Sequence, residues 1–218
     1  MINISLLKDS LASLFSGALV SLEITFFSLI IGTIGGTLLA LMLLYGNKPV
    51  RIVGHVYVTI IRGTPMLIQL ITLFYVLPHF GIVLSPFWSA ILAIGLNSVA
   101  YVSQIIRAGI QAVGSGQIEA AQTLGFSPVQ IVRLIILPQA LRAIFPALGN
   151  EFIMLIKDSS LASIIGVTEL THQGSIIMSR TYDALTVYAG VALIYLVMTS
   201  TASLLLHILE QRLSYARN

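Results

Sequence analysis

The longest apolar runs without a charge decide what this chain can fold into. Ile24–Leu44 and Phe87–Ile106 each contain at least 20 residues and no charged side chain. A hydrocarbon core about 30 Å thick requires about 20 apolar residues per helix. Because these runs are continuous and do not alternate with polar positions, helices and not barrel strands are predicted to cross the bilayer. The fold class is therefore all-α, a polytopic membrane protein.

Five such helices fit into the 218 residues, of which 57% are hydrophobic and 9% charged, against roughly 25% charged in soluble domains. Gly32, Gly36 and Ala40 form a small-residue ridge in the first helix, which favours close helix packing in lipid. Pro65 is predicted to begin or bend the second helix. We expect one transmembrane domain over 1–218 with spans at about 14–44, 58–77, 87–107, 140–167 and 184–209.

The distribution of basic residues predicts the orientation. Five spans place the termini on opposite sides, and cytoplasmic loops carry an excess of Lys and Arg. With the C-terminus cytoplasmic, only Lys8 and Arg180 lie outside, and Lys157 is embedded. The other eight of the eleven basic residues then lie at or near the cytoplasmic interface: Lys48, Arg51, Arg62, Arg107, Arg133, Arg142, Arg212 and Arg217. Snorkelling of long side chains at span ends explains Arg62 and Arg107.

The segment Arg107–Gln139 is too polar for a span and is predicted to form two short cytoplasmic helices. Gly125 suits the position after a helix end, Ser127 suits an N-cap, and Pro128 suits the first residue of the next helix. We expect the first of these helices over Gln117–Leu124, with Glu119 in its first turn and one side available for docking. That side carries Ile118, Ala121 and Leu124. The second helix is expected to end at Pro138.

Glu119-Ala120-Ala121, followed by Gly125 and by Ile135-Ile136-Leu137-Pro138, resembles the EAA loop of ATP-binding-cassette importer permeases, here over about 114–138. The resemblance covers about Leu22–Leu213 and narrows to the polar amino acid uptake permeases. Ser159 and His172 replace the usual Thr and Arg, which leaves the solute open. Further blocks that look like this family are Arg62-Gly63-Thr64-Pro65, Leu96-Asn97-Ser98, Leu137-Pro138-Gln139-Ala140, Pro146–Phe152 and Lys157–Leu161.

This resemblance implies a type I (MetI-like) permease fold and a permease subunit that moves a polar, zwitterionic or cationic amino acid across the bacterial cytoplasmic membrane. It implies as partners two ATPase subunits, a second permease and an external solute-binding protein, with no nucleic acid. Docking of the ATPase is assigned to Glu119, Ala120, Ala121 and Gly125. The chain lacks the Gly-x-x-x-x-Gly-Lys-Ser/Thr motif, so ATP and Mg²⁺ are expected on the ATPase, and the permease is expected to have no cofactor and no enzymatic activity.

Ionisable residues within a span are functional candidates, because they are costly in hydrocarbon. Glu151 and Asp158 are seven residues apart and share one face of the fourth span. Asn97, Tyr101 and Gln104 form a polar stripe on the third span. We expect the two helices to enclose a polar chamber in which the carboxylates bind the ammonium group of an amino acid.

Structural roles compete with this interpretation. Asp158 has two alternatives, pairing with Lys157 or capping a helix break at Ser159, and Glu151 has the alternative of packing against a second copy. The stripe on the third span would then supply interhelical hydrogen bonds. A free-standing secondary transporter also remains an alternative. No catalytic group is predicted, and the absence of Cys and the spacing of the four His predict no metal site.

Overall fold

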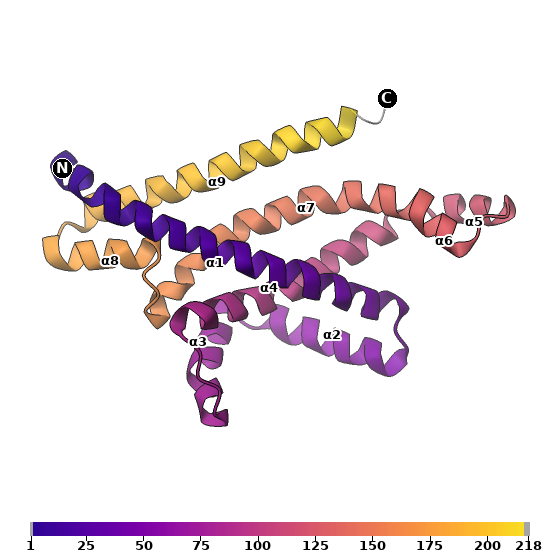
Figure 1. Cartoon of the computed structure of the whole chain (residues 1–218), viewed down its shortest axis with the longest axis horizontal. Helices are drawn as coiled ribbons and strands as arrows, with labels where there is room; N and C mark the ends of the chain where they lie inside the picture. Colours follow the sequence, from indigo (N-terminus) through magenta and orange to yellow (C-terminus); the bar gives the residue numbers. More distant parts are fainter. Residues whose placement is uncertain (1, 216–218) are drawn as a thin grey trace.

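Four long helices form the body of the protein in a computed structural model that describes residues 2–215, with side chains as far as Arg212. Contacts join α1 to α4, α4 to α7 and α7 to α9, so these helices lie side by side (Figure 1). All regular elements of the described residues are helical, which confirms the all-α prediction. The long helices are α1 (Ile4–Tyr45), α4 (Pro86–Gln111), α7 (Leu137–Asp158) and α9 (Ala184–Tyr215).

The small-residue ridge of α1 packs directly against α4. A Cβ added to Gly32 would collide with Ser98, and one added to Gly36 would come within 2.7 Å of the Val102 side chain. Small residues therefore allow the two backbones to approach closely, as the spacing predicts. This contact fixes the orientation of α4, which carries several of the polar residues considered below.

The bend predicted at Pro65 in the second span, 58–77, is confirmed. The chain forms α2 (Lys48–Gly63) and α3 (Met66–Val76), which are bent by 106° at the break between them. Thr64 and Pro65 are both extended, because proline disfavours helix at the preceding residue. A 3₁₀ turn, η1 (Leu77–Phe80), continues α3 away from the bundle (Figure 1).

Helix α2 begins at Lys48, ten residues before the predicted start of the second span, so Arg62 lies near the end of a helix. Fourteen residues separate it from Lys48, which places it about 21 Å along α2 from the α1–α2 turn. A hydrocarbon core is only about 30 Å thick. Arg62 therefore lies near the end of α2 that is remote from the α1–α2 turn, beside the break at Thr64.

The predicted ending of a short helix at Pro138 is also wrong. The helix that begins as α6 (Pro128–Ile131) continues through a π-helical turn, η2 (Val132–Ile136), into α7. The Leu137 amide donates to the Val132 carbonyl, five residues back. The wider π turn shifts the hydrogen-bond register immediately before the proline, so the chain continues as one helical segment over Pro128–Ile165.

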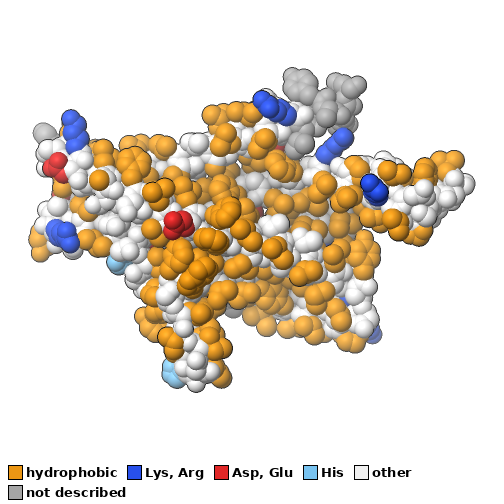
Figure 2. Space-filling view, in the orientation of Figure 1, with side chains coloured by type: hydrophobic (Ala, Val, Ile, Leu, Met, Phe, Trp, Pro, Cys, Tyr) orange, Lys and Arg blue, Asp and Glu red, His pale blue; other side chains and the backbone are white. Residues whose placement is uncertain are grey.

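The two ends of the bundle hold different elements. One end holds the N-terminus, α8 (Leu170–Thr181) and the start of α9, and the other holds the α1–α2 turn, α5 (Ser115–Thr123) and α6 (Figure 1). Lys and Arg side chains cluster near these ends, while hydrophobic side chains cover the middle (Figure 2). Arg217 and Asn218 lie outside the described residues. Between α7 and α8, the 3₁₀ segment η3 (Ser159–Ile165) packs into the core.

Candidate functional site

The break between α2 and α3 is closed by one glutamine. The Gln69 side-chain amide donates to the Ile61 carbonyl at 2.7 Å, to the Thr64 carbonyl at 3.1 Å and to the Thr64 hydroxyl at 2.8 Å. Its oxygen accepts from the Asn97 amide at 2.9 Å. Irregular backbone is tolerated at membrane depth only where its polar groups are satisfied. Asn97, a predicted solute residue, therefore ties α4 to this break through Gln69.

Tyr101, one turn further along α4, lies under Arg62. The Arg62 guanidinium carbon is 5.4 Å from the centre of the Tyr101 ring, which is a cation–π contact. Tyr101 is 39% exposed, so the pair lies at the surface of this single chain. A cation and a half-exposed phenol at this depth indicate a face that protein or water covers, because lipid solvates them poorly.

Glu151 approaches α4 from the other side. The Ser98 hydroxyl donates to Glu151 Oε1 at 2.7 Å, and Glu151 is half-buried on α7. Contacts between α4 and α7 hold this pair in place. Asn97, Tyr101 and Glu151 thus each contact a partner along about one turn of α4. Asn97 bonds to Gln69 and Tyr101 lies under Arg62, whereas Glu151 accepts from Ser98 on the other side of α4.

Gln104 and Asp158 lie at the margins of this cluster. The Gln104 side chain donates to the Ser103 hydroxyl at 3.3 Å, and Asp158 makes no side-chain cap for η3, which excludes the capping alternative. Because α4 and α7 are antiparallel, the two residues extend in opposite directions from the Ser98–Glu151 pair (Figure 1). Each lies about 9 to 10 Å from it along the helix axes. Gln104 and Asp158 therefore lie apart from the residues nearest Ser98, on opposite sides along the bundle axis.

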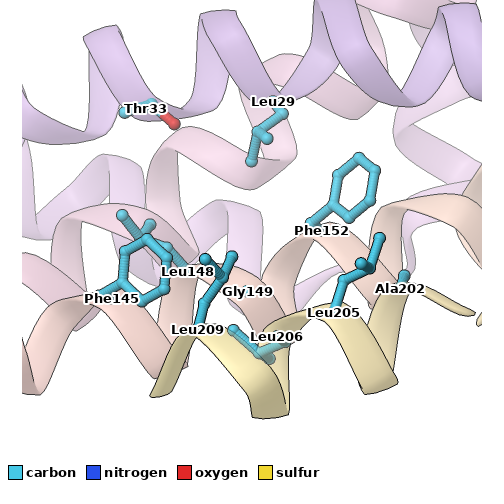
Figure 3. Close-up of a pocket in the computed structure, with 10 residues that line it drawn as sticks. All are labelled: Leu29, Thr33, Phe145, Leu148, Gly149, Phe152, Ala202, Leu205, Leu206 and Leu209. Carbon is cyan, nitrogen blue, oxygen red and sulfur yellow. The ribbon is translucent and has the colours of Figure 1, made fainter. Parts of the chain in front are cut away.

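The cavities of the bundle are mainly apolar. One of about 380 Å³ lies beside the α2–α3 break, where Thr64 and Gln69 are among its lining residues. A cavity of about 330 Å³ separates α7 and α9 (Figure 3). Leu29, Phe145, Phe152 and Leu205 are among its lining residues, and the polar side chain in the lining is that of Thr33. An amino acid needs partners for its ammonium and carboxylate groups, so this apolar cavity does not suit one. In the described residues no three His, Cys, Asp or Glu side chains are grouped to hold a metal ion.

Sequence analysis did not identify Glu169, which caps α8. Glu169 is fully buried and accepts from the backbone amides of Thr171 at 2.9 Å and His172 at 2.8 Å. The Tyr195 hydroxyl donates to it at 2.9 Å and the Ser21 hydroxyl at 3.2 Å. Burial raises the pKa of Glu169, and these four hydrogen bonds oppose the rise. The carboxylate joins α1, α8 and α9. The sequence feature that could have identified Glu169 is an acidic residue just before a helix, where a negative charge is favourable.

The loop between α4 and α7 confirms the predicted turn chemistry. Gly125 has φ +79°, its amide donates to the Gln122 carbonyl, and the Phe126 amide donates to the Ala121 carbonyl, which is a Schellman motif. Ser127 caps α6 in a capping box with Gln130, and Pro128 follows it. The Gln139 amide donates to the Gln117 side chain at 2.6 Å and joins the loop to α7.

Two details of the loop prediction are wrong. Helix α5 begins at Ser115, so Glu119 is its fifth residue and not in its first turn. The expected docking side does not exist as one surface, because Ala121 is only 2% exposed while Leu124 is 77% exposed. Ala121 packs inward as part of the loop's own support. Glu119, Ala120 and Gly125 remain on the exposed side.

We expect Gly125→Val to uncouple transport, because a β-branched residue at this φ costs about 1 to 3 kcal/mol and distorts the turn. Uptake and stimulation of the ATPase by the solute-binding protein should both fall several-fold in reconstituted vesicles. Gly116→Val is the matched control, since a Cβ at Gly116 meets nothing within 4 Å. Wild-type uptake and stimulated ATPase activity in Gly125→Val would refute a coupling role.

Comparison with known proteins gives consistent matches over most of the chain. The model of the family "Binding-protein-dependent transport system inner membrane component" matches residues 32–215. An L-cystine transport system permease protein of Bacillus subtilis is 42% identical, covering 95% of this chain and 90% of that one. The glutamine transport system permease protein of Escherichia coli is 37% identical, covering 92% of each.

Solved structures agree. A crystal structure of an amino acid ABC transporter with histidines matches with a TM-score of 0.92 and 43% identity, covering 97% of this chain and 99% of that one. An inward-facing methionine ABC transporter matches with a TM-score of 0.74 and 21% identity, covering 92% and 95%, which shows the likeness of fold.

Proposed function

Because the chain belongs to the family of binding-protein-dependent transport system inner membrane components, we propose that it is the permease subunit of an ATP-driven amino acid importer. The observation that carries the proposal is similarity over at least 90% of the chain to permeases named for glutamine and cystine. The solute is a polar, zwitterionic or cationic amino acid. A free-standing secondary transporter is not favoured, because these relatives are named as parts of transport systems.

The proposed partners are those that membership of this family implies. Two ATPase subunits bind ATP and Mg²⁺, and they dock at the exposed loop residues Glu119, Ala120 and Gly125. Ala121 supports this surface from within. A second permease completes the membrane part of the transporter, and an external solute-binding protein delivers the amino acid.

Within the membrane, we assign solute contact to the cluster around α4. Glu151 supplies a carboxylate for the ammonium group, and Asn97 and Tyr101 flank it. Asp158 and Gln104 lie about 10 Å to either side, where a solute passes before and after this position. No covalent chemistry is required. When the docked ATPase subunits move, the continuous helical segment Pro128–Ile165 transmits the movement to α7.

Mass spectrometry of material copurified with the tagged chain tests this assembly. We expect an ATPase chain and a permease, either a second copy or a paralogue, in stoichiometric amounts. A chain that purifies without any ATPase, and that transports amino acids when reconstituted in that form, contradicts the proposal.

The proposed orientation places the N-terminus outside and the C-terminus in the cytoplasm of the bacterial inner membrane. Six described basic residues support it at the end that holds the α1–α2 turn and α5: Lys48, Arg51, Arg107, Arg133, Arg142 and Arg212. Lys8 and Arg180 lie at the opposite end. Arg62 is not counted among these residues, because it lies at the end of α2 that is remote from the α1–α2 turn.

Cysteine labelling checks this orientation, and the chain contains no native Cys to interfere. Val83 is 78% exposed in the loop that precedes α4, beside Leu84, for which an external position is also expected. A membrane-impermeant thiol reagent should label Val83→Cys in intact spheroplasts and Gly116→Cys only after lysis. The reverse pattern contradicts the orientation.

A further inference from the structure

The cavity between α1, α7 and α9 has apolar walls and an open side. Its volume of about 330 Å³ is within the range of about 300 to 1,000 Å³ that is usual for small-molecule sites. Leu29 of α1 and Phe152 of α7 point into it (Figure 3). Phe145, Leu205 and Leu209 also line it, and all three are exposed in this chain. The cavity is therefore open at the surface of the bundle, where a hydrocarbon chain can enter it.

A second cavity extends this one toward one end of the bundle. Its volume is about 370 Å³, and it shares Phe145 and Leu148 with the first cavity, so the two meet at these side chains. Arg142 is part of its lining and precedes Phe145 by three residues, or about 4.5 Å along α7. This is the end of the bundle that holds α5 and the α1–α2 turn (Figure 1). The two cavities together, which we call the α7–α9 groove, are apolar and have a cation at this end.

Helix α9 brings two more charges to the same end of the groove. Arg212 follows Leu209 by three residues, which places it about 4.5 Å further along α9 and about 60° round its axis. Glu210 follows Leu209 directly and lies about 100° from it. Together with Arg142, two guanidinium groups and one carboxylate leave a net charge of +1. An apolar groove with a single net positive charge at its end matches one phosphodiester that carries acyl chains.

A second copy of this chain suits the groove less well than a lipid. A two-fold contact between copies places the same patch on both sides of the interface. It would set Arg142 and Arg212 against the same two cations of the second copy, and like charges repel. A phospholipid brings a negative charge at the depth of the headgroups and hydrocarbon below it, in the order in which the groove presents cations and apolar side chains.

We propose that the α7–α9 groove binds a diacyl phospholipid of the adjacent membrane leaflet, with an acyl chain between α7 and α9 and the phosphate on Arg142 and Arg212. A guanidinium can hold a phosphate with two parallel hydrogen bonds. Leu206 of α9 packs so closely on Gly149 of α7 that a Cβ there would collide with it. The lipid fills the space beside this contact and supports α9 against α7. This site is separate from the proposed solute site and does not depend on it.

Lipid binding to the delipidated transporter, purified with its copurifying chains, tests this site. Native mass spectrometry counts bound molecules during titration with dioleoyl phosphatidylglycerol or with dioleoylglycerol, which has the same chains and no phosphate. Wild type should bind one phosphatidylglycerol per permease chain, and dioleoylglycerol at least about tenfold more weakly. The joint change Arg142→Gln and Arg212→Gln should weaken phosphatidylglycerol binding at least about tenfold. Ala202→Phe, which adds a ring to the lining, should abolish it.

Matched controls separate the groove from general effects of charge and size. Arg51→Gln with Arg133→Gln removes two exposed arginines at the same end, and Leu204→Phe adds a ring at an exposed position of α9 outside the lining. Both should bind lipid as wild type does. Melting temperatures establish that Ala202→Phe is folded, and the joint arginine variant leaves the apolar walls unchanged.

Three results would overturn the assignment while the importer function stands. One is wild-type binding of phosphatidylglycerol in the joint arginine variant or in folded Ala202→Phe. Another is equal binding of dioleoylglycerol and phosphatidylglycerol by wild type. The third is efficient disulfide formation between two permease chains that carry Leu205→Cys, because protein and not lipid would then cover the groove.

Discussion

Glu169→Ala should lower the free energy of unfolding by about 3 kcal/mol or more. The substitution removes the acceptor for two backbone amides and two hydroxyls, and each buried donor left unpaired costs about 1 to 3 kcal/mol. Because these donors come from α8, α9 and α1, all three helices lose a shared anchor. Denaturant titration of the purified transporter measures the loss.

Two further variants separate this effect from a general loss of charge. Glu23→Ala makes the same change at an exposed carboxylate of α1 and should leave the unfolding midpoint within experimental error. Tyr195→Phe removes one donor and should cost about 1 kcal/mol. A wild-type midpoint in Glu169→Ala would show that the buried network does not hold α8.

Glu151→Gln should reduce uptake of a cationic amino acid at least about tenfold, which corresponds to about 1.4 kcal/mol. The change keeps the size of the side chain and removes its charge, and a charge-assisted hydrogen bond is about twice as strong as a neutral one. A neutral amino acid should lose less. Because Ser98 still has an acceptor in the glutamine side chain, the α4–α7 contact is retained.

Uptake into proteoliposomes with the cognate binding protein and ATP measures this effect. ATPase association should remain intact, since Glu151 is remote from α5. Glu23→Gln is the control, because it removes an exposed carboxylate from α1 and should transport at the wild-type rate. If Glu151→Gln itself transports the native solute at the wild-type rate, then Glu151 is structural and does not bind the ammonium group of the solute.

Local signals in the sequence predict much of this fold. Uninterrupted apolar runs identify α1, α4 and α9, because only long helices satisfy their backbone in lipid. Gly125 and Ser127 identify the turn between α5 and α6, because a positive φ and an N-cap each favour particular residues. These features depend on neighbours within a few positions along the chain.

Features that depend on distant contacts were not predictable in the same way. The 106° angle at Pro65 is supported by Gln69, which lies in an apolar run, and the helix continues at Pro138 because a π turn precedes it. Glu151 was identified by its cost in lipid, yet its partner Ser98 lies in another helix. Glu169 was missed because its importance comes from hydroxyls on α1 and α9.

ATP-dependent accumulation in proteoliposomes tests the central claim most directly. The purified chain is reconstituted with its copurifying ATPase and solute-binding protein, and uptake of a panel of radiolabelled amino acids is followed with ATP or a non-hydrolysable analogue inside. We predict concentrative uptake of a zwitterionic or cationic amino acid that requires the binding protein and hydrolysable ATP. Uptake driven by a proton or sodium gradient in vesicles that contain the chain alone would contradict the assignment as an importer permease.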